Sequence, residues 1–149
     1  MTIRLKRLDN IDVVCTDVDA LVAFYGGLLG LPLRLPYEPG LGWAGFKAGD
    51  VVIYFIQEDG DPTHPPHPPP RFTGADNPPG IDSFAFEVDS LDEAIAELDP
   101  HVRWAGDIVA SEWYRYRGLH DPEGNLLYLT EPLLDRQDPP VPAPGDDAG

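Results

Sequence analysis

Histidine and cysteine, the side chains that most often carry chemistry in small proteins, are few in this sequence. The 149 residues include four His and one Cys. His64 and His67 have the spacing of a helical metal-binding pair, but the prolines around them favour an extended, solvated linker. His101 and His120 fall in a loop and beside a turn, and Cys15 falls in an apolar strand pattern. No nucleophile has a base placed beside it, so the sequence predicts no catalytic residue.

Aromatic side chains are the more conspicuous candidates for a binding site. The chain contains three Trp, six Tyr and six Phe. Residues 112–117 read EWYRYR, and tyrosines also occur in the strand-like segments 51–56 and 126–130. Such rings stack on flat organic molecules, and a few polar groups beside them fix a ligand's orientation. Each ring could equally fill a sheet core, so the elements that position the rings decide between these interpretations.

The first half of the chain begins with a strand and a helix. The alternating residues Ile11, Val13 and Cys15 are typical of a half-buried strand. Asp17 or Asp19 is placed to cap the helix that follows, because a short carboxylate accepts from the free N–H groups of the first turn. The glycine at position 30 ends the helix. Its apolar stripe consists of Val18, Leu21, Val22, Tyr25, Leu28 and Leu29.

The same order of elements returns in the second half. Apolar alternation over 84–88 predicts a strand. Ser90 and Glu93 form the pattern of a capping box, and Pro100 ends the helix that they begin. Further strand-like segments are 33–35, 43–47 and 51–56 in the first half, and 103–104, 113–119 and 126–130 in the second.

This repetition predicts two βαβββ modules within a single domain, residues 1–132. Module one spans about residues 5–58 and module two about residues 81–132, with a Pro-rich linker at 59–80 between them. The tail, 133–149, is rich in Pro, Asp and Gly, and we expect it to be disordered.

Three sequence segments, together with the doubled module, are similar to those of a known protein family. They are VDALVAFYGGLLGLPL, IDSFAFEVDSLDEAIAEL and GLHDPEGNLLYLTEP, beginning at residues 18, 81 and 118. With the doubled module, they resemble the glyoxalase/bleomycin-resistance/dioxygenase (vicinal oxygen chelate, VOC) superfamily. The resemblance implies an α+β fold whose tandem βαβββ modules form a curved, cup-like mixed sheet. It also implies a ligand inside the cup and a homodimer.

The metal-dependent branches of that superfamily bind their metal through a His or Gln in each module's first strand and a Glu in its last strand. The matching positions hold Asn10 and Tyr54 in module one, and Ser83 and Tyr128 in module two. Neutral amides and hydroxyls are weak ligands for Fe(II), Ni or Zn, and a tyrosine with an ordinary pKa near 10 is a poor one. We therefore expect no metal and no cofactor, which disfavours glyoxalase, dioxygenase and thiol-transferase activity.

We expect an aromatic cup instead. Its expected ligand-binding residues are Asn10, Asp12, Tyr37, Trp43, Tyr54, Ser83, Trp113, Arg115 and Tyr128, with Tyr114 and Tyr116 as further candidates. Bleomycin-resistance members bind drugs without a metal, so the resemblance predicts sequestration of an aromatic natural product or antibiotic, and thereby resistance. The alternative is a metal-free isomerase, hydrolase or cyclase whose acid and base would come from Asp12, Tyr54, Glu87, His120 or Tyr128.

The net charge of the chain excludes some classes of binding partner. Twenty-six acidic against ten basic residues give a net charge of −16. This charge repels phosphate backbones and anionic lipid surfaces, so we expect neither nucleic acid nor a membrane as a partner. A cationic or neutral small molecule suits the field better. The lone cysteine, and a start without the apolar stretch of a signal peptide, lead us to expect a cytoplasmic protein.

Overall fold

A computed structural model describes residues 3–58 and 80–133 of the chain. The predicted linker, apart from Gly80, and the predicted tail, apart from Leu133, lie outside the described residues, as do His64 and His67. The chain divides into two compact units. The first comprises Met1–Phe84 with His120–Leu126, and the second comprises Ala85–Leu119 with Leu127–Gly149. The turn at 120–126 therefore belongs with the first unit, although the sequence division places it in module two.

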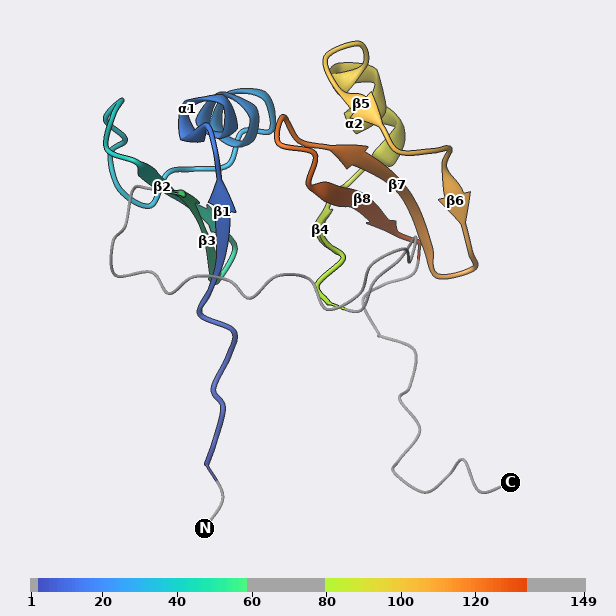
Figure 1. The fold of residues 1–149 in the computed structure, drawn as a ribbon. Coiled ribbons are helices and arrows are strands. Elements are labelled where there is room, and N and C mark those ends of the chain that lie inside the picture. The colour runs from blue at the N-terminus through green and yellow to red at the C-terminus, as the bar shows by residue number, and fades with distance from the viewer. Residues whose placement is uncertain (1–2, 59–79, 134–149) are drawn as a thin grey trace. The chain divides into compact units, whose positions relative to one another are not determined.

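The first unit is built on a three-stranded sheet (Figure 1). Its strands are β1 (Asn10–Cys15), β2 (Trp43–Ala48) and β3 (Val51–Gln57), in the order β1-β3-β2. β3 pairs in parallel with β1 and antiparallel with β2. The segment expected as a strand around 33–35 forms a single bridge, Leu33 to Phe46.

The helix of the first unit has two parts, α1 (Val18–Leu21) and η1 (Val22–Leu28). Asp17 caps α1, because its carboxylate accepts from the Ala20 N–H at 3.1 Å. η1 is a π-helix, in which the wider turn lets the Leu29 N–H donate to the Phe24 carbonyl at 2.9 Å. Gly30 ends the helix with a φ of 75°, a conformation that costs glycine no steric strain.

One face of this sheet packs against the helix to form the core of the unit. Tyr25 of η1 is fully buried, and its ring stacks on Phe55 of β3 with centroids 4.5 Å apart. Phe46 and Ile53 are buried on the same side of the sheet. The alternation that the sequence predicts for β1 is consistent with this arrangement, because Cys15 is buried whereas Asp12 is exposed.

The second sheet has five strands, in the order β4-β8-β7-β5 with β6 paired to β7. The strands are β4 (Ser83–Glu87), β5 (Arg103–Trp104), β6 (Val109–Ala110), β7 (Tyr114–His120) and β8 (Leu126–Pro132), and α2 (Leu91–Leu98) follows β4. Strand β6, two residues long, was not predicted. Its short pairing with β7 matches Val109 to Tyr116 and Ala110 to Arg115.

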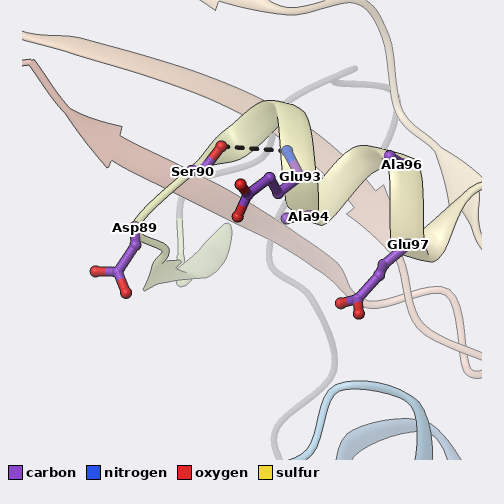
Figure 2. A pocket seen from close by; sticks show the side chains of 6 residues that line it. All are labelled: Asp89, Ser90, Glu93, Ala94, Ala96 and Glu97. Carbon is purple, nitrogen blue, oxygen red and sulfur yellow. Dashed lines mark hydrogen bonds between the residues drawn. The ribbon is translucent and has the colours of Figure 1, made fainter.

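Helix α2 begins where the capping pattern places it. The Ser90 hydroxyl accepts from the Glu93 N–H at 3.2 Å (Figure 2). Leu91 and Leu98 are buried, which anchors the helix at both ends, and Pro100 follows just after the last turn. No helix in the described part of the chain has both the length and the apolar character needed to cross a membrane.

Candidate functional site

The open face of the first sheet, opposite η1, gathers four of the sequence-predicted binding residues. Paired residues of neighbouring strands point to the same side of a sheet. Asp12 pairs with Tyr54, and Tyr54 pairs with Gly45. Asn10 and Trp43 share this side, because each lies two positions along its strand from Asp12 and Gly45. We call Asn10, Asp12, Trp43, Gly45 and Tyr54 the open face.

A missing side chain shapes the open face. A Cβ added at Gly45 would lie 2.7 Å from Cε1 of the Tyr54 ring, closer than real contacts allow. The Tyr54 ring therefore leans from the central strand over the backbone of β2, where it meets Trp43 with centroids 6.2 Å apart. Both rings are half-buried. Glycine within a strand marks such a close approach, and that is the only signal in the sequence that could have pointed to Gly45.

The polar groups of the open face lie on β1. The Asn10 Nδ2 donates to Oδ1 of Asp12 at 2.8 Å. Asn10 is half-buried, whereas Asp12 is exposed. The amide therefore holds one carboxylate oxygen and leaves the other directed to solvent or to a ligand. The combination is an aromatic pair with one oriented anionic group beside it.

The side chains at these positions do not fit a metal centre. Asn10 and Tyr54, which match the ligand positions of the metal-dependent branches, do share the open face. They supply an amide and a phenol, neither of which replaces the imidazole and carboxylate that transition metals require. Within residues 3–58 and 80–133, no group of three or more His, Cys, Asp or Glu side chains is arranged to hold a metal ion. We derive no chemistry through a metal at this site.

The second sheet carries a smaller aromatic cluster. Tyr116 of β7 and Tyr128 of β8 meet edge to face with ring centroids 5.6 Å apart. Leu119 and Leu127 are fully buried, so strand alternation places both tyrosines on the face opposite these core residues. Trp113 precedes β7, and its backbone carbonyl accepts from the Leu133 N–H at 2.8 Å. Both tyrosines and Trp113 are half-buried.

Ser83 opens β4 and is half-buried in the first unit. Its neighbour Phe84 contacts the Tyr25 ring at 6.3 Å, so Ser83 points to the other side of the strand.

Arg115 does not join the aromatic residues. It alternates with Tyr116 and lies on the same side of β7 as the buried Leu119. Its guanidinium binds the Asp92 carboxylate of α2 at 2.9 and 3.3 Å and lies 3.5 Å from Glu131. The side-chain hydrogen bond and charge of Arg115 lower the pKa of Asp92. Arg115 was expected to line the cup, and in the structure its side chain links α2 to the sheet.

Tyr37 also lies away from the open face. Its hydroxyl donates to the Asp19 carboxylate in the first turn of α1. This bond directs the ring to the helix side of the unit, away from the residues of the open face. The cause is a loop whose path the strand alternation of the sequence does not determine.

A buried polar cluster stabilises the first unit on the helix side of its sheet. Asp121, 1% exposed, accepts from the Tyr25 hydroxyl at 2.8 Å and from the backbone N–H groups of Glu123 and Asn125 at 2.9 Å. The Asn125 Nδ2 adds a fourth donor at 2.8 Å. Burial, and then the charge of Asp121, raise the pKa of Tyr25 far above its ordinary value. The three donors of Glu123 and Asn125 close the Asp-Pro-Glu-Gly-Asn turn around the Asp121 carboxylate, and the Tyr25 hydroxyl joins this turn to η1.

Two further groups, Cys15 and His120, bear on whether the chain could carry out acid–base or nucleophilic chemistry. Burial raises the pKa of the Cys15 thiol from 9.0 to about 11, with Glu123 adding to the effect, so this cysteine is a poor nucleophile at neutral pH. His120 ends β7, and its buried Nδ1 has no hydrogen-bond partner among the described residues. Of the two histidines that the structure describes, His101 and His120, only His120 has a buried ring nitrogen without a partner.

A shallow hollow of about 480 Å³ lies beside α2 (Figure 2). It is lined by Asp89, Ser90, Glu93, Ala94, Ala96 and Glu97. It contains none of the sequence-predicted binding residues and offers no aromatic surface. Its carboxylates lie on the exposed side of the helix, where they keep the surface hydrated.

Comparisons with known proteins agree with this fold. The family model "Glyoxalase/Bleomycin resistance protein/Dioxygenase superfamily" matches residues 7–129. The uncharacterized protein YaeR of Escherichia coli (strain K12) is 29% identical over 133 residues, which cover 85% of this chain and 97% of YaeR.

Two solved structures are similar in fold. TnmS3, an antibiotic binding protein from Streptomyces sp. CB03234, superposes with a TM-score of 0.61 at 23% identity, covering 88% of this chain and 99% of TnmS3. Lactoylglutathione lyase from Agrobacterium tumefaciens superposes with a TM-score of 0.63 at 20% identity, covering 86% of this chain and 95% of the lyase. At these identities the likeness concerns the fold, which hosts both binding and catalysis.

Proposed function

The chain belongs to the Glyoxalase/Bleomycin resistance protein/Dioxygenase superfamily, and from that premise we propose that it is a metal-independent small-molecule-binding protein. Its ligand is an aromatic natural product or antibiotic, and its role is resistance by sequestration. The observation that carries the proposal is the open face, where Trp43 and Tyr54 form an aromatic surface beside the Asn10–Asp12 pair.

The chemistry of this face favours binding over turnover. Half-buried rings gain free energy by covering a flat apolar ligand, and a few polar groups orient it. The only cysteine of the chain, Cys15, lies on the helix side with a raised pKa, so it does not serve as a nucleophile. The similarity to TnmS3, which is described as an antibiotic binding protein, supports the same class of function.

Calorimetry with a panel of cationic glycopeptide and aromatic polyketide antibiotics tests the proposal. We expect saturable binding with one ligand per site, unchanged by chelators, and recovery of the intact ligand by mass spectrometry. Trp43→Ala should weaken binding by about thirtyfold, which is the effect of losing an anchoring aromatic worth about 2 kcal/mol. Trp104→Ala is the matched control, because Trp104 is also half-buried but packs under Arg117 in the second unit.

Two results would refute this proposal. One is the absence of binding by every member of the panel, together with equal behaviour of Trp43→Ala and wild type. The other is about one Fe, Ni, Mn or Zn per chain after dialysis, detected by elemental analysis and required for binding.

The second candidate is a metal-free enzyme of the isomerase, hydrolase or cyclase type. The observation in its favour is His120, whose buried Nδ1 lacks a partner among the described residues and could take a proton from a substrate. Turnover of excess ligand that is abolished in His120→Gln and insensitive to chelators would establish this activity. Recovery of the ligand unchanged would exclude it for that compound.

A further inference from the structure

We propose that the open face recognises a specific class of ligand, an aromatic cation, whose positive nitrogen lies against the Asp12 carboxylate while its ring stacks on Tyr54. This inference rests on the proposed function and names the chemistry of the molecule that the face selects. Four observations support it: the register of the strands, the position of the Tyr54 ring, the hydrogen bonding and lack of an ion pair at the Asp12 carboxylate, and the net charge of the chain.

Strand register places the Asp12 carboxylate and the Tyr54 side chain at neighbouring positions on one side of the sheet. Asp12 and Tyr54 are paired residues on neighbouring strands, so their side chains emerge on the same side of the sheet. Neighbouring strands are about 4.8 Å apart, which is the scale of one aromatic ring. A ligand whose charged nitrogen is part of the ring, or is one short arm away from it, can therefore meet both groups at once.

Gly45 keeps the place beside Asp12 open. Because the Tyr54 ring leans over the bare backbone of β2 at Gly45, it leans away from β1 and from Asp12. One face of the Tyr54 ring covers the backbone at Gly45, and the other face is available to a ligand, with Trp43 extending the aromatic surface. A methyl group at position 45 would push the ring up and towards β1. Gly45 is therefore a positioning residue for the stacking surface.

The carboxylate is oriented and lacks a cationic partner. Asn10 donates to Oδ1 of Asp12 at 2.8 Å, which holds the group in place without neutralising it. The nearest ion pair along the chain joins Arg7 to Asp9, and among the described residues no basic side chain forms an ion pair with Asp12. Two basic residues share this side of the sheet. Lys47 lies in the row of Asn10 and Val52, two positions along β2 from Gly45. Arg34 lies beside Gly45, 3.7 Å between its Cβ and a Cβ added at Gly45, so β3 and β2 separate it from Asp12.

The whole chain reinforces this local preference. A net charge of −16 raises the concentration of cations near the surface and lowers that of anions. Aromatic faces attract cations through the ring quadrupole, so Tyr54 and Asp12 favour the same sign of charge. An anionic aromatic compound of equal size would meet repulsion from both.

Two probes of matched size test the inference, N-methylquinolinium and quinoline, which is neutral at neutral pH. Binding is measured by calorimetry and by the shift of the Trp43 indole N–H in NMR spectra. We expect the cation to bind about fivefold to tenfold more tightly, the combined effect of a partly exposed charge pair and a cation–π contact. We expect its affinity, but not that of quinoline, to fall with added salt.

Asp12→Asn keeps the shape of the side chain and removes its charge, so it should abolish the preference for the cation over quinoline. Asp50→Asn removes one negative charge from the turn between β2 and β3, off the open face, and should preserve the preference. Gly45→Ala should weaken both probes, and a wild-type melting temperature would separate the loss of the stacking surface from unfolding.

The outcomes separate the two proposals. If both probes shift Trp43 with equal affinity, or if Asp12→Asn retains the preference, the aromatic-cation inference is wrong and the binding function stands. If neither probe shifts Trp43, the open face does not bind aromatic molecules, and both proposals fall.

Discussion

Replacing Tyr25 by Phe removes one hydroxyl from the buried cluster and leaves the rest of the core intact. The ring retains its stacking on Phe55, at 4.5 Å between centroids, so no cavity forms. What is lost is one of four donors to the buried Asp121 carboxylate, at 2.8 Å. A hydrogen bond to a charged group contributes about 1.5–3 kcal/mol, and three donors remain, so we expect a loss of about 2 kcal/mol in the free energy of unfolding.

Chemical denaturation gives this free energy, and calorimetry gives the melting temperature. For a chain of this size, 1 kcal/mol corresponds to about 2–4 °C, so the variant should melt about 4–8 °C below wild type. Tyr114→Phe is the matched control, because Tyr114 is 36% exposed and should change the free energy by less than about 0.5 kcal/mol.

A double-mutant cycle isolates the pair. Asp121→Asn alone should be more costly than Tyr25→Phe, because it removes the charge that four donors surround. The double variant should show a coupling energy of about 1–2 kcal/mol between the two positions. Additive effects of the two changes, or an unaltered stability of Tyr25→Phe, would mean that the hydroxyl does not hold the turn as the structure indicates.

Three other predictions concern the Cys15 thiol, the role of Arg115 and the oligomeric state. Raising the pH from 9 to 11 should lower the free energy of unfolding. Burial raises the pKa of the Cys15 thiol from 9.0 to about 11, so in this pH range the thiol ionises more readily in the unfolded chain than in the folded one. Denaturation curves measured at each pH should show a smaller loss in Cys15→Ala. Arg115→Gln should leave ligand affinity unchanged, because the guanidinium binds Asp92 on the helix side; a large loss of affinity in calorimetry would return Arg115 to the site. Light scattering should give about twice the 16.4 kDa mass of one chain, as the family resemblance implies, and a mass of one chain at working concentration would contradict this.

The elements of the fold could be predicted because local rules decide them. The carboxylate of Asp17 and the hydroxyl of Ser90 cap the helices as their positions in the sequence indicate. The α+β class and the family follow from the repeated order of strands and helix, and both are confirmed by the match over residues 7–129. The π-helical turn at Val22–Leu28 could not be foreseen, because its apolar stripe is the same as that of an α-helix.

The site was only partly predictable because strand parity and ring placement depend on distant residues. In the segment EWYRYR either the arginines or the tyrosines could face the core. Leu119 settles the question by being fully buried, which puts Arg115 on the helix side and Tyr116 on the other. The ring of Tyr54 is placed by the absence of a side chain at Gly45, on a neighbouring strand. The residues next to Tyr54 in the sequence therefore do not predict where its ring lies.

The same register that would assemble a metal site assembles a different site when the side chains change. Parallel pairing of β1 with β3 brings positions 10 and 54 to one face, whatever residues occupy them. An imidazole and a carboxylate at these positions would supply the donor atoms that transition metals bind. An amide and a phenol do not, and the phenol ring lies over the backbone at Gly45 instead. Under the proposed function, the free energy of ligand binding would come from ring contacts and from the charge at Asp12, so the same backbone register that serves chelation in other members would serve an organic ligand here.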